Sequence, residues 1–247
     1  MGSYHATSGE RGIDPAQQGK RLKGFWGEAA GLKYVQVEAE DAPQDLPLIV
    51  AIHGRGADAT DLAGLAPEID ALGYRWILPQ GPRPVALGPA YTGWAWYELG
   101  EAQAGTTLAS GDALATFIDH MLIQLGVARD RALLMGFSQG AVMALYAGLT
   151  SPEPFAGIVA MSGYLPNAKA LEAVLPERRD RKVLMVHGTE DQTLSVELGR
   201  RARDSLVAAG LSPEYVEFDM GHQITEESLA VVRQYIHRVL PPGAQLE

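Results

Sequence analysis

The chain has 247 residues, with 20 lysines and arginines against 30 aspartates and glutamates, so its formal charge at pH 7 is −10. It contains no cysteine, which excludes disulfide scaffolds, cysteine-ligated metal sites and cysteine nucleophiles. The acidic excess disfavours binding to nucleic acid and to anionic membrane surfaces. With 47% hydrophobic residues, the composition is typical of one soluble globular domain.

The start of the chain is polar and lacks the apolar stretch of a signal peptide. We therefore expect residues 1–22 to form a flexible tail, residues 23–247 to form a single domain, and the protein to be cytoplasmic. The uncharged run between Arg131 and Glu153 is long enough to span a membrane. Glycines and polar residues from Gly136 onward interrupt it, which indicates a buried strand followed by a buried helix.

The rest of the chain alternates short apolar runs with segments of helical periodicity. Most runs are continuous, which is typical of strands buried on both faces. The order predicts an α/β fold with a mostly parallel sheet of about seven strands and helices on both faces. The expected strands are 33–37, 46–53, 74–79, 132–137, 155–162, 182–187 and 214–218. The expected helices are 59–72, 106–125, 141–149, 168–175, 195–209 and 225–240.

The strand expected at 46–53 ends in His53-Gly54-Arg55-Gly56. The backbone N–H of Arg55, between two glycines, is a candidate donor for a negatively charged oxygen. We expect His53 to brace this loop rather than to act as an acid or base. A dinucleotide-binding loop is the alternative, but the next strand ends in Pro79-Gln80 where that fingerprint needs an acidic residue.

Residues 81–105 contain three prolines and five glycines, and we expect them to form a long irregular loop. Loops of this length in compact domains are usually functional or mobile. The apolar residues here, with one from a later loop, are candidates for the wall of a substrate site. These candidates are Leu87, Trp94, Trp96, Tyr97 and Leu165. Packing in the core is the alternative for Trp96 and Tyr97.

The most informative motif is G-x-S-x-G at residues 136–140, between an expected strand and an expected helix. Such a turn leaves no room for side chains beside the serine and exposes its hydroxyl, which makes Ser138 a candidate nucleophile. A glycine-rich turn with an incidental serine is the alternative. The N–H of Gln139, at the start of a helix, is a second candidate donor for the oxyanion.

A serine nucleophile needs a base and an acid that orients the base. His222 follows the strand expected at 214–218, and Asp191 follows the strand expected at 182–187. Both are therefore expected at the carboxyl edge of the sheet, where ligand and catalytic residues gather. Glu190 and Asp219 compete with Asp191 for the role of the acid. We favour Asp191 because an intervening helix and strand separate it from the histidine.

These motifs resemble those of the phospholipase/carboxylesterase family of α/β-hydrolases, which includes acyl-protein thioesterases. The resemblance covers residues from about 25 to 240. It rests on HGRG at 53–56, AWY at 95–97, GFSQG at 136–140, HGTED at 187–191 and GH at 221–222. The resemblance implies an α/β-hydrolase fold and cofactor-free hydrolysis by Ser138, Asp191 and His222. It also implies backbone oxyanion donors at Arg55 and Gln139.

We therefore expect a serine carboxylesterase that hydrolyses small to medium acyl esters through an acyl-enzyme intermediate. An acyl-thioesterase or lysophospholipase with the same triad is the alternative, as is a catalytically silent ligand-binding module of this fold. No metal or organic cofactor is expected, because the six histidines form no His-x-x-x-His pair or similar cluster. The expected partner is a small-molecule ester, with no nucleic acid and no membrane span, and a homodimer is left open.

Overall fold

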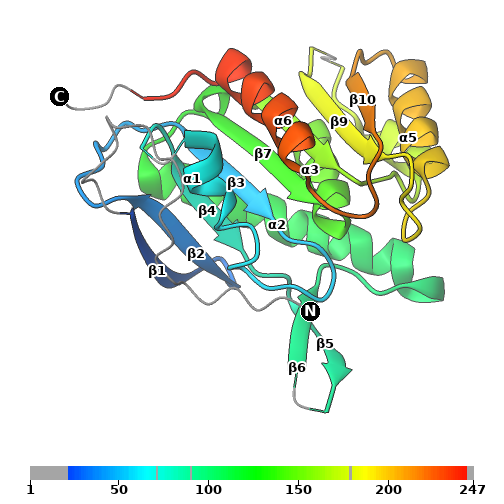
Figure 1. The fold of residues 1–247 in the computed structure, drawn as a ribbon, viewed down its shortest axis with the longest axis horizontal. Helices are drawn as coiled ribbons and strands as arrows, with labels where there is room; N and C mark the ends of the chain where they lie inside the picture. Colours follow the sequence, from blue (N-terminus) through cyan, green and yellow to red (C-terminus); the bar gives the residue numbers. More distant parts are fainter. Residues whose placement is uncertain (1–21, 71, 90, 178–179, 244–247) are drawn as a thin grey trace.

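The fold is built on an eight-stranded sheet in which the strands have the order β1-β2-β4-β3-β7-β8-β9-β10 (Figure 1). The computed structural model describes residues 22–70, 72–89, 91–177 and 180–243. Neighbouring strands from β4 to β10 run parallel, whereas β1 and β2 pair antiparallel at one edge. These strands are β1 Leu22–Ala29, β2 Leu32–Ala39, β3 Leu48–Ile52, β4 Arg75–Pro79, β7 Ala132–Phe137, β8 Gly157–Met161, β9 Val183–Gly188 and β10 Glu214–Phe218.

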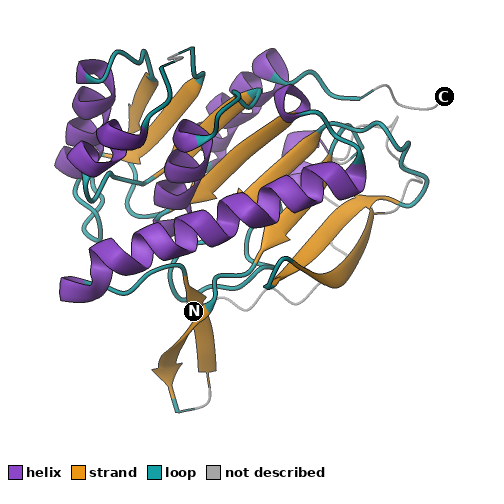
Figure 2. Cartoon of the chain, turned by 180° about the vertical axis from the view of Figure 1, so that it is seen from behind, coloured by secondary structure: helices purple, strands orange, loops and turns teal. Residues whose placement is uncertain are grey.

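Helices cover both faces of the sheet because side chains alternate between the two faces along each strand. Leu48, Val50 and Ile52 of β3 belong to the core beneath α2, α3, α4 and α5. Ile49 and Ala51 of the same strand belong to the core beneath α1 and α6. Figure 2 shows the long helix α2 crossing the first of these faces. The helices are α1 Leu65–Asp70, α2 Gln103–Leu125, α3 Gln139–Thr150, α4 Ala168–Val174, α5 Val196–Ala208 and α6 Glu226–Val239.

The predicted mostly parallel sheet with helices on both faces is confirmed, with one strand more than expected. The additional strand, β1, begins at Leu22, the last residue of the predicted tail. Residues 1–21 lie outside the described residues. Strand β1 is an exposed edge strand, with Phe25 43% and Trp26 55% exposed. It therefore lacks the continuous apolar run by which the buried strands are recognised in the sequence.

The prediction of an irregular loop over residues 81–105 is wrong. The segment forms a hairpin of β5 Arg83–Gly88 and β6 Tyr91–Ala95, which projects from the body of the molecule (Figure 1). A short 3-10 helix, Gly100–Ala102, follows, and α2 begins at Gln103. Glycine and proline favour loops, so their frequency in this segment predicted a loop where the chain forms a hairpin.

The base of the hairpin is tied to the loop that follows β3. Gly56 N donates to Trp94 O at 2.7 Å, and Trp94 N donates to Ala57 O at 2.8 Å. A Cβ at Gly93 would overlap Gly56 O, so glycine is needed inside β6 for this close approach. The hairpin and the loop after β3 are therefore fixed to each other.

Helix α1 is shorter than the predicted helix over residues 59–72. Asp58 Oδ1 accepts hydrogen bonds from Thr60 N at 2.8 Å and Thr60 Oγ1 at 2.6 Å. Such local side-chain bonds favour a turn over a helix. The uncharged run between Arg131 and Glu153 forms β7 and α3, as predicted. Among the described residues, no helix has both the length and the apolar character needed to cross a bilayer.

Candidate active site

Ser138 occupies a strained turn between β7 and α3. Its backbone has φ 56° and ψ −118°, a conformation that residues other than glycine rarely adopt. A Cβ at Gly136 would overlap Gly140 O, and a Cβ at Gly140 would overlap Ile52 O. The two flanking glycines thus allow the chain to turn directly from strand to helix. The turn leaves Ser138 partly exposed at the carboxyl edge of the sheet.

Two neighbouring loops at the same edge are hydrogen-bonded to each other. Thr189 N, after β9, donates to Phe218 O at 2.8 Å, and Glu190 N donates to Met220 O at 3.1 Å. A Cβ at Gly188 would overlap Met220 O, so this glycine permits the loops to touch. The loop after β9 and the loop after β10 therefore behave as one unit.

Within this unit, His222 Nδ1 donates to Asp191 Oδ2 at 2.7 Å. The Asp191 side chain has no exposed surface, and its Oδ1 accepts the N–H groups of Thr193 at 2.9 Å and Leu194 at 2.8 Å. Buried His187 donates from Nε2 to Leu194 O at 2.8 Å and so braces the same loop. The N–H groups of Thr193 and Leu194 fix the carboxylate, which holds His222 as the Nδ1–H tautomer and leaves Nε2 to accept a proton.

Of the three carboxylates that compete for the role of the acid, Asp191 is the one bonded to His222. Asp219 is exposed, and its Oδ1 accepts from Thr189 Oγ1 at 3.1 Å. Glu190 is exposed at the surface of the same loop. The geometry therefore favours Asp191 as the orienting acid.

The imidazole of His222 lies over the turn that carries Ser138. Its ring packs against the Phe137 ring with the centroids 4.8 Å apart. Ser138 Oγ and His222 Nε2 make no hydrogen bond with any described residue. In enzymes without substrate the catalytic hydrogen bonds are often long, and they tighten when substrate binds.

The backbone N–H groups of Arg55 and Gln139 lie beside Ser138. Neither has an acceptor within the described part of the chain. Gln139 is the first residue of α3, where the N–H is free and the helix dipole favours negative charge. A Cβ at Gly54 would lie 3.3 Å from Ser138 Cβ, so the loop that carries Arg55 touches the serine. The pair is suited to stabilise a negatively charged oxygen at this point.

Buried His53 braces the loop after β3, as predicted. Its Nδ1 donates to Gly54 O at 2.7 Å, and its Nε2 accepts from Gly81 N at 2.9 Å. Because the imidazole is only 1% exposed, burial lowers the pKa of His53 below its ordinary value. The ring is therefore neutral, as an acceptor at Nε2 requires.

The side chain of Gln139 has a supporting role that the sequence did not reveal. Its Oε1 accepts from Trp96 N and its Nε2 donates to Tyr97 O, both at 3.0 Å. Trp96 Nε1 also donates to His53 O at 3.0 Å. The start of α3, the end of the hairpin and the loop after β3 are thereby joined. No local pattern indicates these bonds, because Gln139 is 43 and 42 residues from its two partners.

The candidates for a substrate wall lie in different environments. Trp96 and Tyr97 are 0% and 1% exposed and belong to the core, so Trp96 has no surface left for a substrate. Leu87 is 49% exposed on the hairpin, and Trp94 pairs with the loop after β3. Leu165 lines a cavity of about 210 Å³ together with residues of α2, α3 and α4. Among the described residues, no cluster of histidine and acidic side chains is placed to hold a metal ion.

Comparison with known proteins places this geometry in context. Residues 32–240 match the phospholipase/carboxylesterase family. Acyl-protein thioesterase 1 homolog 1 of Dictyostelium discoideum is 26% identical over 205 residues, covering 78% of this chain and 90% of that protein. Acyl-protein thioesterase 1 of Gibberella zeae is 29% identical over 224 residues, covering 81% and 94%. The crystal structure of esterase PE8 is 26% identical with a TM-score of 0.70, covering 89% of this chain and 100% of that chain. The predicted α/β-hydrolase fold is confirmed.

The buried His53 predicts a loss of stability in acid. The unfolded chain binds a proton at this residue below about pH 6.5, whereas the folded chain, with its lowered pKa, does not. The free energy of unfolding should therefore fall as the pH drops through 6. The slope from this residue reaches up to about 1.4 kcal/mol per pH unit. Urea unfolding at a series of pH values measures it.

Replacement of the buried imidazole isolates its contribution. In His53→Gln the amide keeps a donor and an acceptor but does not titrate. The free energy of unfolding should therefore fall less steeply as the pH is lowered. His120→Gln, at an exposed position on α2, serves as the matched control and should keep the wild-type slope. An unchanged slope in His53→Gln would show that other groups cause the acid instability.

Proposed function

The chain belongs to the phospholipase/carboxylesterase family of hydrolases, and we propose that it is a serine carboxylesterase that acts through an acyl-enzyme intermediate. The observation that carries the proposal is the 2.7 Å hydrogen bond between His222 and buried Asp191, at the same sheet edge as strained Ser138. The three residues also follow one another in the chain order of α/β-hydrolase triads.

Acylation begins with attack of Ser138 Oγ on the carbonyl carbon of a bound ester. His222 Nε2 takes the hydroxyl proton, and the Asp191 carboxylate stabilises the imidazolium that forms. The N–H groups of Arg55 and Gln139 bind the oxyanion of the tetrahedral intermediate. Collapse breaks the bond to the alcohol, which leaves with the proton from His222.

Deacylation repeats these steps with water as the nucleophile. His222 Nε2 removes a proton from the water, which attacks the acyl carbon bound to Ser138 Oγ. The second tetrahedral intermediate uses the same two N–H donors. Its collapse releases the carboxylic acid, and Ser138 Oγ regains its proton from His222.

The acyl chain is proposed to occupy the cavity of about 210 Å³ between α2, α3 and α4. Val142, one helical turn beyond Ser138, is part of its lining, as are Leu108, Leu165 and Leu171. Pockets for drug-sized ligands usually measure about 300–1,000 Å³. A smaller, largely apolar cavity suits a short to medium acyl chain.

Only about twenty residues separate β8 from β9, and α4 is the single helix among the described residues of this segment. This is too short for the large helical lid of many lipases. We therefore propose a fairly open site, with Leu87 and Trp94 near the oxyanion loop rather than in the acyl cavity.

Hydrolysis of acyl thioesters is a second candidate, favoured by the names of the relatives, which are acyl-protein thioesterases. The same three residues and the same oxyanion donors would act on a thioester. Comparison of kcat/KM for a butyryl ester and the corresponding butyryl thioester distinguishes the two substrate classes.

The role of the nucleophile is tested by Ser138→Ala. Removal of the hydroxyl should lower kcat for a 4-nitrophenyl ester by roughly 10⁴- to 10⁶-fold, as single losses within a triad do. Ser212→Ala, at an exposed serine, is the control and should keep wild-type kcat. Thermal unfolding should be unchanged in both. Full activity in Ser138→Ala would exclude the proposed mechanism.

The choice of acid is tested by three amide variants. Asp191→Asn should lose up to about 10⁴-fold in kcat, because the amide no longer holds the productive tautomer of His222. Glu190→Gln and Asp219→Asn should stay within about tenfold of wild type, equivalent to about 1.4 kcal/mol in barrier. A larger loss in Asp219→Asn than in Asp191→Asn, at unchanged thermal stability, would assign the acid to the loop beside the histidine.

A further inference from the structure

Arg55 carries a positive charge without a partner at the oxyanion loop. Its side chain is exposed and makes no ion pair or hydrogen bond with any described residue. The nearest acid along the chain is Asp58, whose Oδ1 accepts from Thr60 N and Thr60 Oγ1 instead. Since the N–H of Arg55 is a proposed oxyanion donor, its side chain begins beside the reacting carbonyl.

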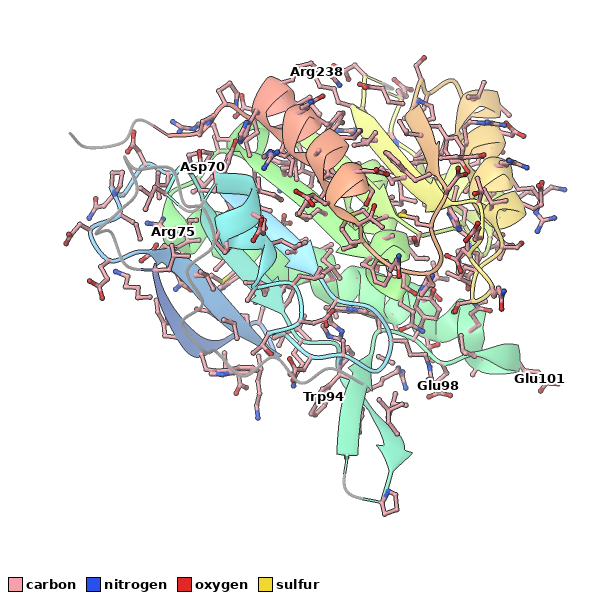
Figure 3. The ribbon with its side chains drawn as sticks, in the orientation of Figure 1. Asp70, Arg75, Trp94, Glu98, Glu101 and Arg238 are labelled. Atoms are coloured by element: carbon pink, nitrogen blue, oxygen red, sulfur yellow. The ribbon has the colours of Figure 1, made fainter. Side chains whose placement is uncertain are left out.

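Arg55 also lines a cavity of about 540 Å³ at the base of the hairpin. The other charged residues of the lining are Arg83 and Glu98, and they pair with each other at 2.7 Å. Figure 3 shows Glu98 beside the base of the hairpin. Because that pair is neutral as a whole, the net charge of the lining comes from Arg55.

This uncompensated charge differs from the charge of the protein as a whole. The chain carries a formal charge of −10, which would repel an anionic substrate at long range. The Arg55 guanidinium in this cavity provides local attraction, and its planar fork matches the two oxygens of a carboxylate. Arg55 is therefore suited to select a substrate by charge.

The two cavities have separate linings. The cavity of about 210 Å³ proposed for the acyl chain shares no lining residue with the cavity that contains Arg55. With the acyl chain in the first, the second remains for the alcohol part of the ester. Pro82 and Val85 contribute to its lining and provide apolar surface next to the charge.

We propose that the Arg55 side chain binds an anionic group on the alcohol part of the substrate, so that the enzyme prefers esters whose leaving group carries a carboxylate. The inference rests on the proposed esterase function and names the substrate class of the same site. It makes Arg55 bifunctional, with the backbone N–H at the oxyanion and the side chain at the leaving group.

The test uses two esters of the same shape and different charge, 4-(butyryloxy)benzoate and 4-(butyryloxy)benzamide. The measured quantity is the ratio of kcat/KM for the anionic ester to kcat/KM for the neutral ester. In Arg55→Met, which keeps an unbranched apolar stem but removes the charged guanidinium, this ratio should fall about tenfold. Arg55→Lys keeps the charge but loses the fork, so its ratio should lie between the two.

Arg201→Met is the matched control, because Arg201 is an exposed arginine on α5 without an ion pair among the described residues. Its ratio should equal that of wild type. Added salt should lower the wild-type ratio, because Arg55 is exposed and its charge is screened. The ratio in Arg55→Met should respond little to salt.

A ratio in Arg55→Met within about twofold of wild type would overturn the inference. So would a charge preference that appears only when the carboxylate is on the acyl side, as in 4-nitrophenyl hemisuccinate compared with 4-nitrophenyl butyrate. If the wild type hydrolyses the neutral ester and Ser138→Ala does not, the proposed function stands even when the inference about Arg55 fails. Absence of such hydrolysis in wild type would overturn both.

Discussion

The close approach of helix α3 to the end of strand β3 is the constraint on which the whole site depends. A side chain at Gly140 would overlap Ile52 O, and one at Gly136 would overlap Gly140 O. Only with both glycines can the chain turn at Ser138 with a positive φ and begin a helix at the next residue. That turn exposes the serine and leaves the Gln139 N–H free. It also brings the loop of β3 against the serine.

The hydrogen bonds of two buried polar side chains, His53 and Gln139, stabilise this arrangement. His53 bridges the loop after β3 to Gly81, and Gln139 bridges the start of α3 to Trp96 and Tyr97. Buried polar groups of this kind stabilise a structure only when their hydrogen bonds are satisfied. The position of the loop that carries Arg55 therefore depends on the hydrogen bonds of buried His53. The side chain that we propose to select the substrate, that of Arg55, is one that these bonds leave exposed.

Much of the fold and the site could be predicted because the relevant signals are local. The buried strands are continuous apolar runs, and the turn at Ser138 has its two glycines within two residues on either side. Strand β1 and the hairpin were missed, since one is an exposed edge and the other is rich in glycine and proline. The contacts of the Gln139 side chain were missed because its partners, Trp96 and Tyr97, lie 43 and 42 residues away in the chain. In the sequence, Leu87, Trp94 and Trp96 are all apolar residues of one expected loop. Only the structure shows that Trp96 is in the core and that Leu87 is at the surface.

The central claim is that Ser138 is a nucleophile activated by His222 and Asp191. Intact-mass and peptide analysis of the full chain after treatment with a serine-directed phosphonate tests it most directly. The account predicts one adduct, located on Ser138, that forms much more slowly in Asp191→Asn. An adduct on another serine, or no adduct under conditions in which the ester is hydrolysed, would contradict it.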